Sequence, residues 1–231
     1  MGRIIAMTGT TGGLGMIIAE KLAEKGYAII FIDRNRTKSA KNAERIRAKH
    51  KDASITLLSC DLERFESVKH VAKTLQKINV DTLLLGSGIY NVPITKCSTG
   101  YNNVFQVNFV SQYYLARYLA ENCPSLKHVV AIGSVAHNYS NIDKNDIDFS
   151  GRTHVSKIYG NSKRFLMFSL YEYFKDEKAI DLSIAHPGVT YTNMTNHYPK
   201  AINWLVKIGI KLFFPRPHKA VRSIVRAVDD S

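Results

Sequence analysis

The sequence predicts an α/β protein with a doubly wound parallel sheet of six strands, and three observations lead to this class. Near-continuous apolar segments alternate with amphipathic helical patterns from end to end, as in a parallel sheet covered on both faces. A glycine-rich turn directly follows the first apolar segment. Residues with suggestive chemistry follow every apolar segment, at the sheet edge where doubly wound folds bind ligands.

The first elements are a strand at residues 4–7 and a glycine-rich turn at 8–15. Its glycines would let the backbone turn tightly, approach a pyrophosphate closely and pack a helix against the strand. An amphipathic helical pattern follows as far as Gly26, and 28–32 form the second strand, which ends in Asp33. Strand, turn and helix in this order predict a dinucleotide-binding unit and disfavour a glycine-rich turn without a ligand.

The remaining elements continue this alternation. Strands are expected at 54–60, 80–85, 127–132 and 180–185, and helices at 38–51, 63–78, 100–121, 159–174 and 217–228. The sequence contains six expected strands and no seventh after the last helix, so either the sheet has six strands or the usual seventh is missing from this sequence. The residues that follow the strand ends are, in order, Gly9, Asp33, Asp61, Gly86-Ser87-Gly88, Ser134 and Pro187-Gly188.

Size and composition narrow the class further. With 231 residues, 45% of them hydrophobic, and no linker, the chain is expected to be a single domain over residues 1–231. The net charge of +13 is spread over helices that also carry acids, and no base-binding motif accompanies it, so nucleic acid is not an expected partner.

Location and metal content are also predicted. The first strand begins at residue 3, so no secretory leader is expected, and the apolar stretch 201–214 is too short and too charged to span a membrane. Cys60, Cys97 and Cys123 form an odd set without metal-ligand spacing, which predicts a cytoplasmic protein without a metal.

Tyr159 and Lys163 are four residues apart in an expected helix, so they share a face. An ammonium there would stabilise a phenolate, which a tyrosine with an ordinary pKa near 10 needs for proton exchange near neutrality. Alternatively, Tyr159 and Lys163 are an ordinary pair of side chains on the surface of a helix, with no catalytic role. Ser134 follows the fifth strand and could bond a substrate oxygen, while Asn108 lies inside a helix, an unfavourable place for asparagine unless its side chain has a function.

With these residues, the chain resembles the short-chain dehydrogenase/reductase family over essentially its whole length. The TGxxxGxG motif of that family matches residues 8–15, and the stretch after Ser134 is similar to the retinol dehydrogenase-like subgroup. The resemblance implies a Rossmann fold. The other matching motifs are Asp61-Leu62, Asn108 in Val-Asn-Phe, Ser134 in Gly-Ser-Val-Ala-His, Tyr159 with Lys163, and Pro187-Gly188 followed by Thr192.

The resemblance implies an NAD(P)-dependent oxidoreductase that interconverts an alcohol and a carbonyl by hydride transfer. Tyr159 would be the general acid/base, Lys163 would lower its pKa and hold the nicotinamide ribose, Ser134 would orient the substrate oxygen, and Asn108 would anchor a proton-relay water. The residues implied to contact the cofactor are Gly9, Thr11, Gly13, Leu14, Gly15, Asp33, Arg34, Asp61, Leu62, Gly88, Tyr159, Lys163, Pro187, Gly188, Val189 and Thr192.

Two positions leave alternatives open. The family has Asn-Asn-Ala-Gly where this chain has Leu85-Gly86-Ser87-Gly88, so an asparagine that ties neighbouring strands is absent, and either Ser87 replaces it or the link is missing. Asp33 would bond the adenosine ribose and repel a 2′-phosphate, which slightly favours NAD. Arg34, with Arg36 and Lys38 nearby, could instead bind that phosphate, so NADP stays open.

Two other classes of protein share parts of this pattern. A catalytically silent NAD(P)-binding sensor or scaffold would usually lack the tyrosine or the lysine, and both are present. A sugar-nucleotide epimerase would need a substrate domain, for which nothing remains after the sixth strand. A pocket lined by aromatic residues would suit an apolar substrate; its candidate neighbours are Tyr90, His137, Tyr191, His197, Tyr198 and Trp204.

The helices that carry Asn108 and Tyr159 bear more apolar surface than one sheet face needs, which predicts a homo-oligomer. Residues 193–217 combine apolar and basic side chains and are expected to be a substrate lid, with a peripheral membrane helix as the alternative. The apolar residues behind the oligomer prediction include Tyr113, Tyr114, Phe165, Phe168 and Tyr171.

Overall fold

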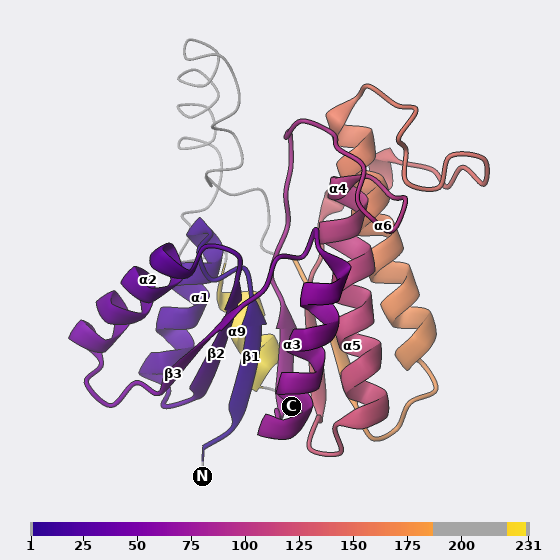
Figure 1. Cartoon of the computed structure of the whole chain (residues 1–231). Helices are drawn as coiled ribbons and strands as arrows, with labels where there is room; N and C mark the ends of the chain where they lie inside the picture. The colour runs from indigo at the N-terminus through magenta and orange to yellow at the C-terminus, as the bar shows by residue number, and fades with distance from the viewer. Residues whose placement is uncertain (1, 187–220, 230–231) are drawn as a thin grey trace.

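The computed structural model describes residues 2–186 and 221–229 (Figure 1). Within these ranges the chain forms one six-stranded sheet in the order β3-β2-β1-β4-β5-β6, and every neighbouring pair is parallel. The predicted doubly wound α/β class is therefore confirmed. The strands are β1 (Ile4–Thr8), β2 (Ala28–Asp33), β3 (Ile55–Ser59), β4 (Thr82–Leu85), β5 (His128–Ile132) and β6 (Asp181–Ala185).

The strand order puts β1 between β2 and β4, where the connections diverge to opposite halves of the sheet. Ile5 of β1 pairs with Ile29 of β2 on one side and with Thr82 of β4 on the other. Because all strands run parallel, the ends of β1 and β4 open on the same edge. Ligands of doubly wound sheets bind at such a switch point.

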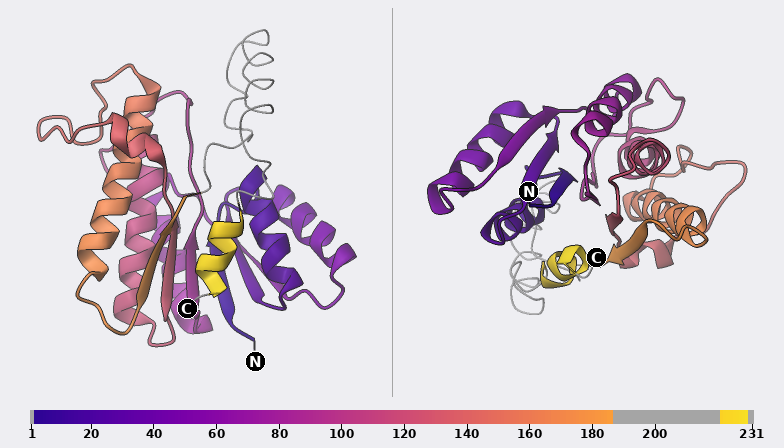
Figure 2. Two further views of the ribbon diagram at one scale, coloured as in Figure 1. Left: turned by 180° about the vertical axis from the view of Figure 1, so that it is seen from behind. Right: turned by 90° about the horizontal axis from the view of Figure 1, so that it is seen from below.

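Helices cover both faces of the sheet (Figure 2). The core between the sheet and α1, α2 and α9 is separate from the core beneath α3, α5 and α6. Strand residues such as Ile5 and Met7 are wholly buried, and each such side chain contributes roughly 2 kcal/mol. The helix bounds are α1 (Gly13–Glu24), α2 (Arg36–Lys49), α3 (Phe65–Ile78), α5 (Ser111–Asn122), α6 (Val155–Phe174) and α9 (Arg222–Asp229).

Two predicted helices differ from the observed ones. The helix expected at 100–121 consists of α4 (Asn103–Phe105), a π-helix (Gln106–Val110) and α5. The helix expected from 159 begins at Val155 instead. Its start could not be predicted because the N-cap residue, His154, makes no side-chain capping bond of the kind that marks a helix start in a sequence.

Several predicted residues lie outside the described part of the chain. These are the expected lid at 193–217 and the cofactor residues Pro187, Gly188, Val189 and Thr192. Among the described helices, none has the length and apolar character needed to cross a membrane. The cytoplasmic location stays a prediction.

Candidate active site

The glycine-rich turn is shaped by close backbone contacts. Gly9 has a φ of +82°, and a Cβ there would lie 2.9 Å from the backbone of Ser87. A Cβ on Gly15 would lie only 2.0 Å from the carbonyl oxygen of Gly9. Both positions therefore need glycine, for conformation in one case and for space in both.

Gly13 differs from these glycines because a Cβ there would meet nothing within 4 Å. Helix α1 begins at Gly13, and its N-cap residue Gly12 supplies no side-chain hydrogen bond. The N–H groups of a helix N-terminus attract phosphate, and an open position beside them leaves room for a ligand. The turn therefore fits the pyrophosphate of a dinucleotide.

Asp33, at the end of β2, is turned into the protein. Its side chain is buried, and its carboxylate accepts hydrogen bonds from the hydroxyl groups of Thr10 and Ser39, the latter at 2.8 Å. The backbone N–H of Thr11 donates to the other carboxylate oxygen at 3.3 Å. Asp33 therefore fixes the glycine turn against the start of α2, and its contact with the ribose stays a prediction.

Arg34 has the opposite orientation, with 64% of its side chain exposed. Its guanidinium lies 2.7 Å from a carboxylate oxygen of Glu63 and 3.9 Å from one of Asp61. The carbonyl oxygen of Leu62 accepts a bond from the Ser111 hydroxyl, which anchors the end of β3 to α5. Asp61 and Leu62 thus lie beside Arg34 at the expected edge.

Asn108 lies in the π-helix, a form that often occurs at functional sites. Its side chain accepts a bond from the N–H of Ile89 at 2.8 Å and donates to the Ile89 carbonyl at 3.0 Å. It also donates to the Ser162 hydroxyl, which in turn donates to the carbonyl of Tyr159. Asn108 therefore joins the loop after β4 to the helix that carries Tyr159.

The hydroxyl of Ser134 lies beside the phenol of Tyr159. Burial raises the pKa of Tyr159 to about 12, and the neighbouring Ser134 hydroxyl opposes this rise. The lowered pKa expected from Lys163 is therefore not observed: the Lys163 ammonium is 6.0 Å from the centroid of the phenol ring. The structure thus holds Tyr159 as a protonated acid.

Lys163 is buried, and its ammonium donates to the carbonyl of Ile132 at 3.0 Å. Burial lowers the pKa of Lys163 to about 8. A Cβ on Gly88 would lie 3.7 Å from both the Lys163 ammonium and Oδ1 of Asn108. Gly88, Asn108 and Lys163 therefore meet at one point of the sheet edge, as the sequence predicted.

The loop that carries Ser134 packs tightly on α6. A Cβ on Gly160 would lie 2.3 Å from the carbonyl oxygen of Ala136 and 2.7 Å from the Ser140 hydroxyl. Only glycine lets this loop come close enough to bring Ser134 to the neighbouring Tyr159. Gly160 is not among the residues predicted from the sequence, although it follows the predicted tyrosine directly.

A link between β1 and the end of β4 is present although the family's asparagine is absent. Ser87 contributes its backbone N–H to this link. The hydroxyl of Thr8 accepts bonds from the N–H groups of Gly86 and Ser87 at 2.9 and 3.1 Å. The same hydroxyl donates to the Gln112 side chain. A Cβ on Gly86 would lie 2.7 Å from the Thr8 carbonyl, so this β4 end approaches β1 more closely than an asparagine would allow.

The lowered pKa of buried Lys163 predicts that the free energy of unfolding depends on pH. Its pKa falls from the ordinary 10.5 to about 8, so between these values the unfolded chain binds more protons and the free energy of unfolding rises with pH. The full rise is about 3 kcal/mol. Above pH 10 the raised pKa of Tyr159 acts in the opposite direction. Urea unfolding from pH 7 to 10 checks this: Lys163→Met should flatten the profile, and exposed Lys157→Met should leave it sloped.

These features define a dinucleotide-binding α/β protein with a candidate proton donor. They are the strand order, the glycine turn, and the cluster of Ser134, Tyr159 and Lys163. A family model described as short chain dehydrogenase matches residues 3–203. The chain belongs to the short-chain dehydrogenase family.

Named relatives are consistent with this assignment. An uncharacterized oxidoreductase of Schizosaccharomyces pombe is 30% identical over 219 residues, 86% of this chain and 63% of the relative. Mouse retinol dehydrogenase 12 is 26% identical over 212 residues, 88% of this chain and 66% of its own length. The chain thus spans about two thirds of the length of these relatives.

A solved structure shares the fold. An alcohol dehydrogenase from the archaeon Thermococcus sibiricus, complexed with 5-hydroxy-NADP, aligns with a TM-score of 0.75 at 14% identity. The alignment covers 99% of this chain and 91% of the other chain.

Proposed function

We propose that the protein is an NAD(P)-dependent oxidoreductase that interconverts an alcohol and a carbonyl. The observation that carries the proposal is the cluster of Tyr159, Lys163 and Ser134 at the sheet edge, with the Lys163 ammonium 6.0 Å from the centroid of the Tyr159 ring, beside a turn that fits a dinucleotide. The nicotinamide would supply or accept the hydride. The chain's own residues would hold the substrate oxygen and move its proton.

Tyr159 has the protonation state that carbonyl reduction requires. A phenol with a pKa of about 12 stays protonated near neutral pH and can donate its proton to the oxygen of a carbonyl. The Ser134 hydroxyl, beside the phenol, can donate its single proton to that oxygen and fix its position. Asn108 bonds to the loop after β4 through Ile89 and to α6 through Ser162. These bonds hold the loop and the helix in a fixed relative position, so the groups on them stay aligned.

An apolar substrate fits the surroundings of Tyr159. The ring of Tyr90 packs edge-on against that of Tyr159, with centroids 5.3 Å apart. A panel of aliphatic, aromatic and terpenoid aldehydes with NADH or NADPH tests the proposal through absorbance of the reduced cofactor. Cofactor that binds but is never consumed would favour the silent sensor.

We propose NADP(H) as the preferred cofactor, in contrast to the slight preference for NAD drawn from Asp33. The carboxylate of Asp33 is bonded within the protein, whereas Arg34, paired with Glu63, presents an exposed guanidinium directly after β2. A guanidinium pairs well with a phosphate. The related fold of the Thermococcus sibiricus enzyme carries an NADP derivative.

Arg34→Ala is expected to weaken NADP binding about tenfold and to change NAD binding little, because a charge-assisted bond contributes about 1.5 kcal/mol or more. Calorimetric titration of both cofactors measures this. Arg45→Ala, which removes an equal charge from the exposed face of α2, is the control. Equal losses for both cofactors would place Arg34 outside the phosphate site.

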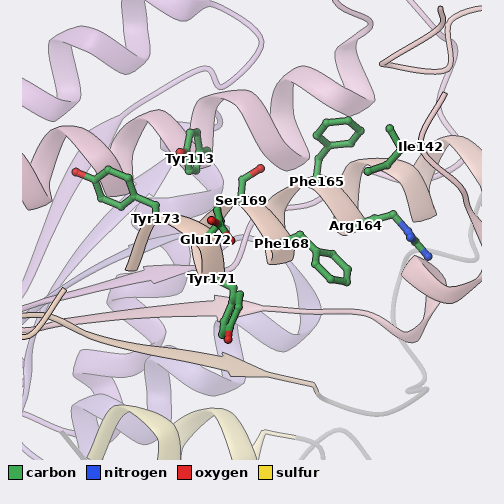
Figure 3. Close-up of a pocket in the computed structure, with 9 residues that line it drawn as sticks. All are labelled: Tyr113, Ile142, Arg164, Phe165, Phe168, Ser169, Tyr171, Glu172 and Tyr173. Atoms are coloured by element: carbon green, nitrogen blue, oxygen red, sulfur yellow. The ribbon is translucent and has the colours of Figure 1, made fainter. Parts of the chain in front are cut away.

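We propose that a second copy covers an apolar groove on α5 and α6 (Figure 3). Phe168 and Tyr171 are 55% and 59% exposed there, beside Tyr113 and Phe165. Sedimentation is expected to show a dimer at micromolar concentration. Phe168→Asp should yield monomers, whereas Ile94→Asp, away from the groove, should not. A monomeric wild-type protein would contradict this proposal.

A further inference from the structure

Gln112, in the first turn of α5, is a wholly buried polar side chain that the proposed chemistry does not use. Its amide oxygen accepts the bond from the Thr8 hydroxyl at 3.3 Å. Its amide nitrogen lies 3.1 Å from the carbonyl of Ser87, 3.2 Å from that of Val107 and 3.0 Å from that of Asn108. Four points in three segments thus converge on one amide group.

The orientation of this amide is fixed by its partners. Carbonyl oxygens only accept hydrogen bonds, so the nitrogen must face the three carbonyls and the oxygen must face the Thr8 hydroxyl. An amide nitrogen has two protons, so two of the three carbonyls share one proton. Leaving such buried acceptors unpaired is costly, so the neighbouring backbone is held where the amide can reach it.

We propose that Gln112 is a positioning residue for the active site, replacing the asparagine tie that the β4 end lacks. It connects the strand that leads into the glycine turn, through Thr8, with the backbone of Asn108. The Asn108 side chain extends this connection to Ile89 and, through Ser162, to Tyr159. The catalytic consequence rests on the proposed function, but the positioning of Asn108 does not.

The chain offers a matched control in Gln106. This glutamine is also wholly buried and lies in the π-helix, but its side chain is bonded to Thr99 and Ser111. Gln106→Met and Gln112→Met remove the same group from neighbouring turns. A general loss of packing would affect both variants alike, whereas a positioning role would separate them.

Amide hydrogen exchange on the protein without ligand tests positioning directly. Gln112→Met is expected to reduce protection of residues 86–92 at least tenfold, because the Ile89 N–H loses a fixed acceptor on Asn108. Gln106→Met should leave that protection within about twofold, at matched global stability in urea. Equal protection of 86–92 in both variants would overturn the proposal, whether or not a substrate is known.

With a substrate from the carbonyl panel, Gln112→Met should lower kcat about tenfold to a hundredfold and leave cofactor affinity nearly unchanged, because small displacements of catalytic groups are costly. A kcat equal to that of Gln106→Met would contradict the role.

If Gln112→Met does not fold, Gln112→Glu replaces it. Its carboxylic acid can donate to one carbonyl when protonated but repels all three when ionised, so residues 86–92 should lose protection as pH rises. Wild-type-like protection throughout that range would count against the proposal.

Discussion

Tyr159→Phe is expected to lower turnover by about 10² to 10⁴, because the substituted ring keeps its packing but has no proton to donate. The structure isolates this effect, since the phenol hydroxyl lies beside Ser134 while the ring packs against Tyr90. Cofactor affinity should stay within a few-fold of wild type. Steady-state rates with an accepted carbonyl, together with calorimetric titration of the cofactor, measure both quantities.

The matched control is Tyr118→Phe, which removes a hydroxyl bonded to Gln76 far along α5. It should retain wild-type turnover. If Tyr159→Phe keeps most of the wild-type rate, another group supplies the proton and Tyr159 is not the general acid/base.

The second large effect is expected in the glycine turn. Replacing Gly15 with alanine should lower both stability and cofactor binding, whereas replacing Gly13 with alanine should lower cofactor binding alone. Gly15→Ala places a Cβ 2.0 Å from the Gly9 carbonyl, so the turn must move, at a cost of about 3 kcal/mol or more. Gly13→Ala meets no protein atom within 4 Å. It should fold with unchanged or slightly higher stability but bind the dinucleotide at least about tenfold more weakly, because its methyl group occupies ligand space.

Urea unfolding and cofactor titration of both variants separate the two effects. Gly15→Ala should lose stability and binding together, whereas Gly13→Ala should lose binding alone. Unchanged cofactor affinity in a stable Gly13→Ala protein would show that the dinucleotide does not lie at this helix terminus.

Much of the fold could be predicted because its signals are local. Each strand is a short apolar run that ends in glycine or a polar residue, and the β1 turn has glycine where a side chain would collide, as at Gly15. Tyr159 and Lys163 could be paired because their spacing alone puts them on one helical face. These signals place the candidate residues at one edge of the sheet, where the structure brings Gly88, Asn108 and Lys163 close together.

Other features depend on contacts that the sequence pattern does not contain. The direction of the Asp33 carboxylate is decided by Thr10 and Ser39, and the pKa of Tyr159 by burial. The π-helix gives no distinctive periodicity over five residues. Gln112 had one available signal: a polar residue four positions after Asn108, on the same helical face, where an apolar residue would otherwise face the core.

In the proposed reaction, hydride passes between the cofactor and a carbonyl carbon while Tyr159 supplies the proton. Reduction of an accepted aldehyde with NADPH that carries deuterium at both positions of the reactive carbon tests this reaction most directly, by mass spectrometry of the alcohol product. We predict one deuterium bound to the former carbonyl carbon with the wild-type protein, and at least about a hundredfold less product with Tyr159→Phe. Product without deuterium at that carbon, or equal product from both proteins, would contradict the account.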